Sequence, residues 1–145
     1  MKDDVKKKIL LVAEDDDDHF LLTVEALQVA GLKQKIHRVK DGKELLDYLF
    51  RRCGFKKFLE EPLPALILLD LNMPKKDGRY ALAEIKKETR LSRIPIVVLT
   101  TSLSEDDAAQ GYDLGIDSYI RKPVHFNELV EVMEQIRKNW LDGER

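Results

Sequence analysis

One short stretch limits the fold more than any other: an apolar run over residues 65–69 that ends at the carboxylate of Asp70. Pro62 and Pro64 stand before this run, and Pro74 follows it closely. A continuous apolar run bounded by prolines is typical of a strand that is covered on both faces. Asp70 is then expected at the carboxyl end of that strand, the edge where open α/β sheets bind ligands. The alternative is that Asp70 only caps the turn that follows.

Size and charge exclude several classes of protein. The chain has 145 residues, which suits one domain with a core over about residues 8–141. The net charge of −2 offers no basic surplus for binding nucleic acid. Cys53 is the single cysteine and cannot form an internal disulfide. The first residues do not resemble a signal sequence, and no apolar run reaches membrane-spanning length, so we expect a cytoplasmic protein.

Strand and helix patterns alternate along the whole chain. Strands are predicted over residues 9–13, 35–39, 65–70, 94–99 and 118–121. Helices are predicted over residues 17–30, after 41–42, from 77–78 onward, over 104–115, and at the end of the chain. Five strand–helix pairs in this order predict a doubly wound α/β domain with one parallel sheet.

Three further expectations concern packing. Residues 51–64 are expected to form an extended connection. The last helix is expected to bury the stripe Leu129, Met133, Ile136 and Trp140, which repeats at helical spacing. The three histidines, at positions 19, 37 and 125, share no spacing typical of a metal site and are expected on the surface.

Charged and hydroxyl side chains follow several of the predicted strands: Glu14, Asp15, Asp70, Thr100 and Lys122. Because the carboxyl ends of parallel strands share one edge, we expect these side chains to converge. Carboxylates at such short range repel one another unless a cation lies between them, and Mg²⁺ suits oxygen ligands and bound phosphoryl groups. A lysine and a hydroxyl can then contact phosphoryl oxygens, which leaves one aspartate free to attack.

As a set, these motifs resemble the receiver domain of two-component response regulators, the CheY-like superfamily. The resemblance covers nearly the whole chain. It is carried by residues 9–15 (ILLVAED), residues 68–74 (LLDLNMP), Thr100, and Lys122 with Pro123. It implies a flavodoxin-like sheet of five strands in the order 2-1-3-4-5.

The resemblance also implies roles for single residues. Asp70 would accept a phosphoryl group, and Asp15, Asp70 and the carbonyl of Asn72 would ligate Mg²⁺. Glu14 would hold a water molecule bound to that ion.

Two further implications concern the switch and one peptide bond. Thr100 and Tyr119 would form a switch pair that moves on phosphorylation. The Lys122–Pro123 peptide bond would be cis.

The implied donor is the phosphohistidine of a sensor histidine kinase or a phosphotransfer protein. The long connection over residues 51–64 resembles that of small receivers that serve phytochrome kinases, some of which form homodimers. The implied protein is a stand-alone switch that catalyses only its own phosphorylation and dephosphorylation. It binds no nucleic acid or membrane itself.

Three other functions are weighed against this one. A haloacid-dehalogenase-type phosphohydrolase also uses a strand-end aspartate, but it needs a second acid where this chain has Asn72, and it needs a later acidic motif or a cap domain. A flavodoxin-like flavin site needs a loop rich in Thr, Ser and Gly after the first strand, which is missing here. An interaction module that is never phosphorylated remains the third alternative.

Thr101 is bulkier than the alanine or glycine often found after the switch threonine of such domains. We expect its side chain to restrict the water that hydrolyses the aspartyl phosphate. Thr101→Ala should therefore lose the phosphoryl group faster than the wild type, as measured by the decay of the phosphorylated mass. An unchanged or slower decay would contradict this prediction.

Overall fold

The computed structural model describes residues 8–70, 75–100 and 115–142, with the backbone alone for 75–79. The strands are β1 (Ile9–Ala13), β2 (Lys35–Val39), β3 (Leu66–Asp70), β4 (Ile96–Thr100) and β5 (Ser118–Arg121). The helices are α2 (Asp17–Val29), α3 (Gly42–Leu49), α4 (Lys75–Lys87) and α6 (Phe126–Ile136). Short helical turns are η1 (Cys53–Phe58), η2 (Leu91–Arg93) and η3 (Arg137–Leu141). The helix predicted to begin at Ser104 lies outside the described residues.

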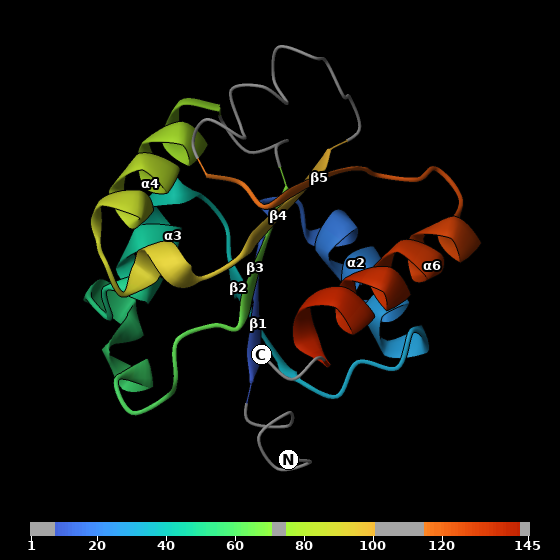
Figure 1. Ribbon diagram of the computed structural model, residues 1–145, viewed down its shortest axis with the longest axis horizontal. Helices are drawn as coiled ribbons and strands as arrows, with labels where there is room; N and C mark the ends of the chain where they lie inside the picture. The colour runs from blue at the N-terminus through green and yellow to red at the C-terminus, as the bar shows by residue number, and fades with distance from the viewer. Residues whose placement is uncertain (1–7, 71–74, 101–114, 143–145) are drawn as a thin grey trace.

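All five strands are parallel and form one sheet in the order β2-β1-β3-β4-β5, which confirms the predicted fold class. Helices α3 and α4 cover one face of the sheet, and α2 and α6 cover the other (Figure 1). The order of strands reverses between β1 and β3, at the centre of the sheet. In this fold, such a reversal opens a crevice at the carboxyl ends of the strands. No helix within the described ranges is long and apolar enough to cross a membrane.

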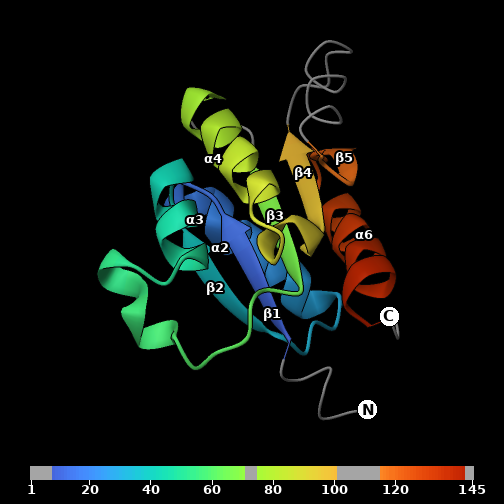
Figure 2. The ribbon, with the colours of Figure 1, turned by 60° about the vertical axis from the view of Figure 1, so that its left-hand side comes forward.

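Alternation along the strands divides the core into two layers, because successive side chains point to opposite faces. Towards α3 and α4 lie Leu11, Ile67, Leu69, Ile96 and Val98. Towards α2 and α6 lie Leu10, Val12, Leu68, Val97 and Leu99. The rotated view in Figure 2 shows the twisted sheet between these two helical layers. The two layers fix which face every residue at the strand ends occupies.

The predicted start of α4 is two residues late, since the helix begins at Lys75 rather than at Asp77. The predicted inward residues of this helix, Ala81, Leu82 and Ile85, are all buried. The boundary therefore differs, but the buried face is as expected.

The end of the chain departs from the predicted stripe. Leu129, Met133 and Ile136 are buried, as expected, but Trp140 is only half-buried and Leu141 is fully buried instead. Residues Arg137–Leu141 form a π-helical turn. A π turn holds one more residue than an α turn, so it shifts the phase of the helix by one position. The prediction of Trp140 as a core residue is therefore wrong.

The sequence pattern did not predict the conformation of residues 51–64, and in the structure Cys53–Phe58 forms a 3₁₀ helix within this long connection. Phe55 and Phe58 pack against the α3–α4 side of the core. The ring centroids of Phe58 and His37 lie 4.6 Å apart, and His37 Nδ1 lies 2.7 Å from the hydroxyl of Tyr48. The surface position predicted for His37 is therefore wrong, because the aromatic side chains of this segment cover it.

The guanidinium of Arg51 holds the segment to α3. It donates hydrogen bonds to the carbonyls of Tyr48 at 2.8 Å, Glu61 at 3.2 Å and Pro62 at 3.0 Å. These contacts fasten both ends of the segment beside β2, which is an edge strand of the sheet.

Replacing Leu141 by alanine tests the π turn. Since Leu141 is fully buried, Leu141→Ala should lower the free energy of unfolding by about 2–5 kcal/mol. Urea unfolding followed by circular dichroism measures the change. Leu21→Ala is a matched control, because Leu21 is 57% exposed and its truncation should cost less than about 0.5 kcal/mol. Equal effects of the two changes would contradict the phase shift.

Candidate functional site

The candidate site lies at the carboxyl edge of the central strands. Asp70 is the last residue of β3 and pairs with Leu99 of β4. Glu14 follows β1, and its N–H donates to the carbonyl of Val39 at 2.9 Å. The pairing of β5 continues past its end, where the N–H of Lys122 donates to the Thr100 carbonyl at 2.6 Å. These backbone hydrogen bonds continue the strand pairing beyond the ends of β1 and β5. They therefore fix the backbone positions from which the side chains of Glu14 and Lys122 extend.

Glu14, Asp70 and Lys122 come together in a buried cluster. Lys122 Nζ lies 3.1 Å from Asp70 Oδ2 and 3.6 Å from Glu14 Oε1. The exposed fractions are 4% for Asp70 and 2% for Glu14. Beside the three side chains lies a cavity of about 10 Å³. The alternation of the strands explains this meeting, since all three positions share a face with the α2–α6 layer.

Thr100 is buried at the end of β4. By alternation it falls on the same face as Val98, in the α3–α4 layer. Tyr119 pairs with Val98 and packs against that layer. The predicted switch pair therefore shares one face of the sheet, while the charged cluster lies on the other.

One predicted metal ligand, Asp15, is not part of the charged cluster. Asp15 is exposed in the turn between β1 and α2. Asn72 lies outside the described residues. The roles of both residues stay predictions.

From the sequence, His19 was expected on the surface and was not identified as a residue near the site. Ligand-type atoms of Glu14, His19 and Asp70 all lie within 4.8 Å of one another. Asp16 caps helix α2 and accepts a hydrogen bond from the His19 N–H, which brings the imidazole to the cluster. In the sequence, only the run Asp15–Asp18 pointed to this position of His19, because one of these aspartates could cap the helix. The capping residue sets where the first helical turn begins, and His19 lies in that turn.

Burial and crowding of charge set the protonation of the cluster. Burial raises the pKa of Glu14 from an ordinary 4.5 to about 8, and its hydrogen bond with Asp70 acts in the same direction. The N–H of Asp16, which donates to Glu14 Oε2 at 3.1 Å, and the charge of Lys122 oppose this rise. Two buried carboxylates therefore share one lysine, and Glu14 keeps a proton at neutral pH in the absence of another cation.

The Lys122–Pro123 peptide bond is trans, so the expectation of a cis bond is wrong for this structure. Trans is also the form that X–Pro bonds favour, by about 0.5–1 kcal/mol.

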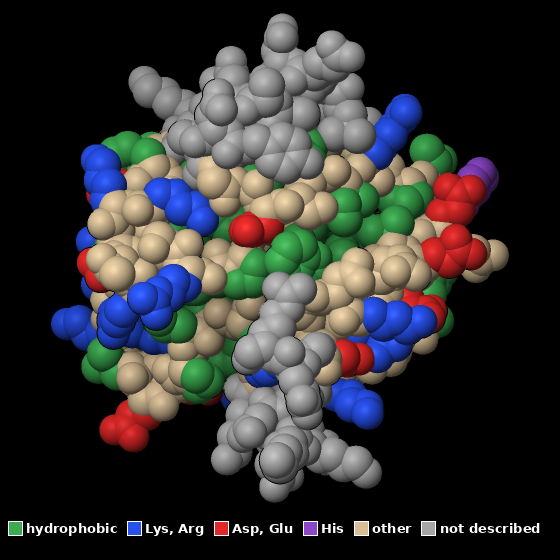
Figure 3. Space-filling model, in the orientation of Figure 1, with side chains coloured by type: hydrophobic (Ala, Val, Ile, Leu, Met, Phe, Trp, Pro, Cys, Tyr) green, Lys and Arg blue, Asp and Glu red, His purple; other side chains and the backbone are tan. Residues whose placement is uncertain are grey.

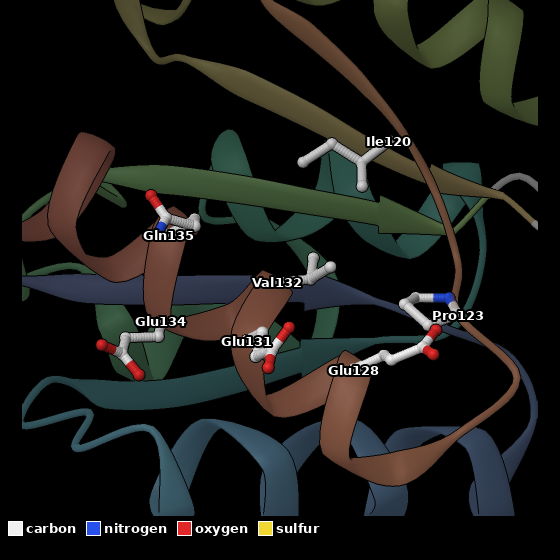
Figure 4. Close-up of a pocket in the computed structure, with 7 residues that line it drawn as sticks. All are labelled: Ile120, Pro123, Glu128, Glu131, Val132, Glu134 and Gln135. Atoms are coloured by element: carbon white, nitrogen blue, oxygen red, sulfur yellow. The ribbon is translucent and has the colours of Figure 1, made fainter.

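A separate groove lies between the end of β5 and the outer side of α6. Its volume is about 650 Å³. Ile120, Pro123 and Val132 line it with Gln135 and three glutamates, Glu128, Glu131 and Glu134 (Figure 4). In Figure 3, a band of hydrophobic side chains crosses the front of the molecule, with acidic side chains at its right-hand end. The lining of this groove includes no residue of the Glu14–Asp70–Lys122 cluster.

The fold and the cluster define a class of protein: a doubly wound α/β domain with a buried aspartate and a lysine at its topological switch point. A family model described as the response regulator receiver domain matches residues 10–134. The chain belongs to this family.

Individual relatives agree with this assignment. The chain is 40% identical to the probable methanogenesis regulatory protein FilR2 of Methanothrix harundinacea, over 88% of this chain and 79% of that protein. It is 39% identical to the response regulator Rcp1 of Synechocystis, over 83% of this chain and 80% of that protein. The crystal structure of the phosphorylated cyanobacterial phytochrome response regulator RcpA superposes with a TM-score of 0.83 at 39% identity, covering 95% and 96% of the two chains. Rcp1 itself has a structure in a Mn²⁺-bound form.

The raised pKa of Glu14 predicts how stability depends on pH. The unfolded chain releases this proton near pH 4.5, whereas the folded protein holds it until about pH 8. Stability without added metal should therefore fall as pH rises through this window, by up to about 1.4 kcal/mol per pH unit. Urea unfolding in EDTA between about pH 5 and 9 measures the slope. Glu14→Gln should flatten it, and identical profiles for the two proteins would contradict the assignment.

Proposed function

We propose that this receiver domain is a phosphoacceptor switch in which Asp70 accepts a phosphoryl group in a Mg²⁺-dependent reaction. One observation carries the proposal. Asp70 is a buried carboxylate at the carboxyl end of the central strand, and Lys122 Nζ lies 3.1 Å from its Oδ2. A buried acid is costly unless it is paired, so its position at a ligand-binding edge favours a functional role.

The chemistry is transfer between a nitrogen and an oxygen. A carboxylate oxygen of Asp70 forms a bond to phosphorus while the bond from phosphorus to the imidazole nitrogen of the donor breaks. The departing imidazole keeps the electron pair of that bond. Lys122 contacts both Asp70 and Glu14, so its ammonium lies where it can pair with a phosphoryl oxygen as charge builds up there.

The residues present fit a divalent cation. Glu14 and Asp70 bring two buried carboxylates to one point, and burial together with the neighbouring Asp70 raises the pKa of Glu14. Mg²⁺, when bound, would neutralise charge on the carboxylates and on the phosphoryl group. Its ligands would be Asp15, Asp70 and the carbonyl of Asn72, with Glu14 holding a bound water.

Phosphorylation of Asp70 would change the packing of side chains on the opposite face of the sheet. Thr100 and Tyr119 lie on the face opposite to the cluster, against the α3–α4 layer, so a movement of the Thr100 hydroxyl towards the phosphoryl group would free space for the ring of Tyr119. The partner-binding surface would change in this way. The domain acts as one unit over residues 1–145 and turns over no separate substrate.

We propose the phosphohistidine of a sensor histidine kinase or of a phosphotransfer protein as the donor. The names of the relatives point to different signals, a phytochrome for RcpA and methanogenesis for FilR2. A phytochrome kinase is therefore one donor to test among several. A homodimer also stays a prediction.

The intact mass after incubation with acetyl phosphate tests the proposal. The wild type should gain one phosphoryl group when Mg²⁺ is present and none in EDTA, since transfer needs the charge of the cation. Asp70→Asn should gain none under either condition, because an amide oxygen is a poor nucleophile.

Asp47→Asn is a matched control. Asp47 is also a buried aspartate held by two cations, with Lys43 at 2.8 Å and Arg52 at 2.7 Å, but it lies in α3. This variant should be labelled as fully as the wild type. If the wild type stays unlabelled under conditions that label a known receiver, the proposal is contradicted. The alternative, an interaction module that works without phosphorylation, is then favoured.

A further inference from the structure

The turn between β1 and α2 holds His19 beside the charged cluster through two successive hydrogen bonds. The Asp16 N–H donates to Glu14 Oε2 at 3.1 Å, and the His19 N–H donates to Asp16 Oδ1 at 2.9 Å. Arg38 secures the same turn from β2, since its Nε donates to the Glu14 carbonyl at 3.0 Å and its Nη1 lies 2.8 Å from Asp17 Oδ1. These contacts fix the first turn of α2 and with it the backbone position of His19.

The ring of His19 places one nitrogen inside the protein. Nδ1 is buried and has no hydrogen-bond partner among the described residues, and Glu14 Oε1 lies 3.9 Å away. A buried polar atom without a partner is uncommon and costs free energy, so it points to a ligand that the site is built to receive. The side chain as a whole is 42% exposed, so the imidazole lies at the edge of the site with Nδ1 turned inward.

We propose that His19 is an additional ligand of the divalent cation at this site and shifts its preference from Mg²⁺ towards transition-metal ions that accept imidazole. This inference rests on the proposed function, because it concerns the same cation. Mg²⁺ takes oxygen ligands almost exclusively, whereas imidazole suits the later first-row divalent ions. One nitrogen among the carboxylates is therefore enough to change which ion binds best.

The distances suit a shared ion. One atom each from Glu14, His19 and Asp70 lies within 4.8 Å of the other two. Donor atoms on opposite sides of an ion with bonds of about 2.1 Å are about 4.2 Å apart, so small side-chain rotations bring His19 and Asp70 within reach of one ion. Glu14 then lies close enough to hold a water bound to that ion. Lys122 already contacts Glu14 and Asp70. A dication bound on the His19 side would share both carboxylates with this ammonium.

Titration of the tag-free protein with CoCl2 and with MgCl2 tests the proposal. Calorimetry gives the two affinities, and the visible absorption of Co²⁺ reports nitrogen ligation. The wild type should bind Co²⁺ more tightly than Mg²⁺. His19→Ala and His19→Gln should each weaken Co²⁺ binding about tenfold or more, as is typical when a group that supports a metal site is lost. Their Mg²⁺ affinity should change by less than about threefold, since Mg²⁺ relies on oxygen ligands.

His125→Ala is the matched control, because His125 is exposed at the start of α6 and lies near the same edge. It should leave both affinities and the Co²⁺ spectrum unchanged. An unchanged ratio of Co²⁺ to Mg²⁺ affinity in both His19 variants would overturn the role of His19 alone. A wild type that binds neither ion would overturn it together with the Mg²⁺ dependence of the proposed function.

Discussion

The contact of Lys122 with Glu14 and Asp70 is the interaction on which the rest of the site depends. Two carboxylates are buried at the end of the sheet, and a single ammonium lies within 3.6 Å of both. Burial makes each charge costly and raises the pKa of Glu14 to about 8, and its hydrogen bond with Asp70 acts in the same direction. The two buried carboxylates therefore fit the divalent cation that we propose to bind here.

The parallel sheet creates this contact and places it on the opposite face from Thr100 and Tyr119. Strands β1, β3 and β5 carry Glu14, Asp70 and Lys122 to one edge and, through the two-residue alternation, to one face. Thr100 and Tyr119 fall on the opposite face, against α3 and α4. The proposed phosphoacceptor and the proposed switch pair therefore lie on opposite faces of the sheet, at the same edge.

Several departures from the sequence-based expectations share a cause. Trp140 fits a regular helical stripe, but a π turn moves Leu141 into the core in its place. His37 fits a half-exposed strand, but the rings of Phe58 and Tyr48 cover it from a segment without a regular pattern. Periodicity predicts what a regular element buries. It cannot predict a local change of phase or a cover supplied by an irregular segment.

By itself, the sequence determined the strands, most helices, the fold class and the nature of the acidic and basic groups at the strand ends. It could do so because apolar runs, prolines and capping residues act locally, and because parallel strands leave few ways to connect. Only the tertiary structure decided which of these groups meet. It brought Glu14, Asp70 and Lys122 within ion-pair distance and left Asp15 exposed. It also added His19, since its position depends on a helix cap and on Arg38 from a neighbouring strand.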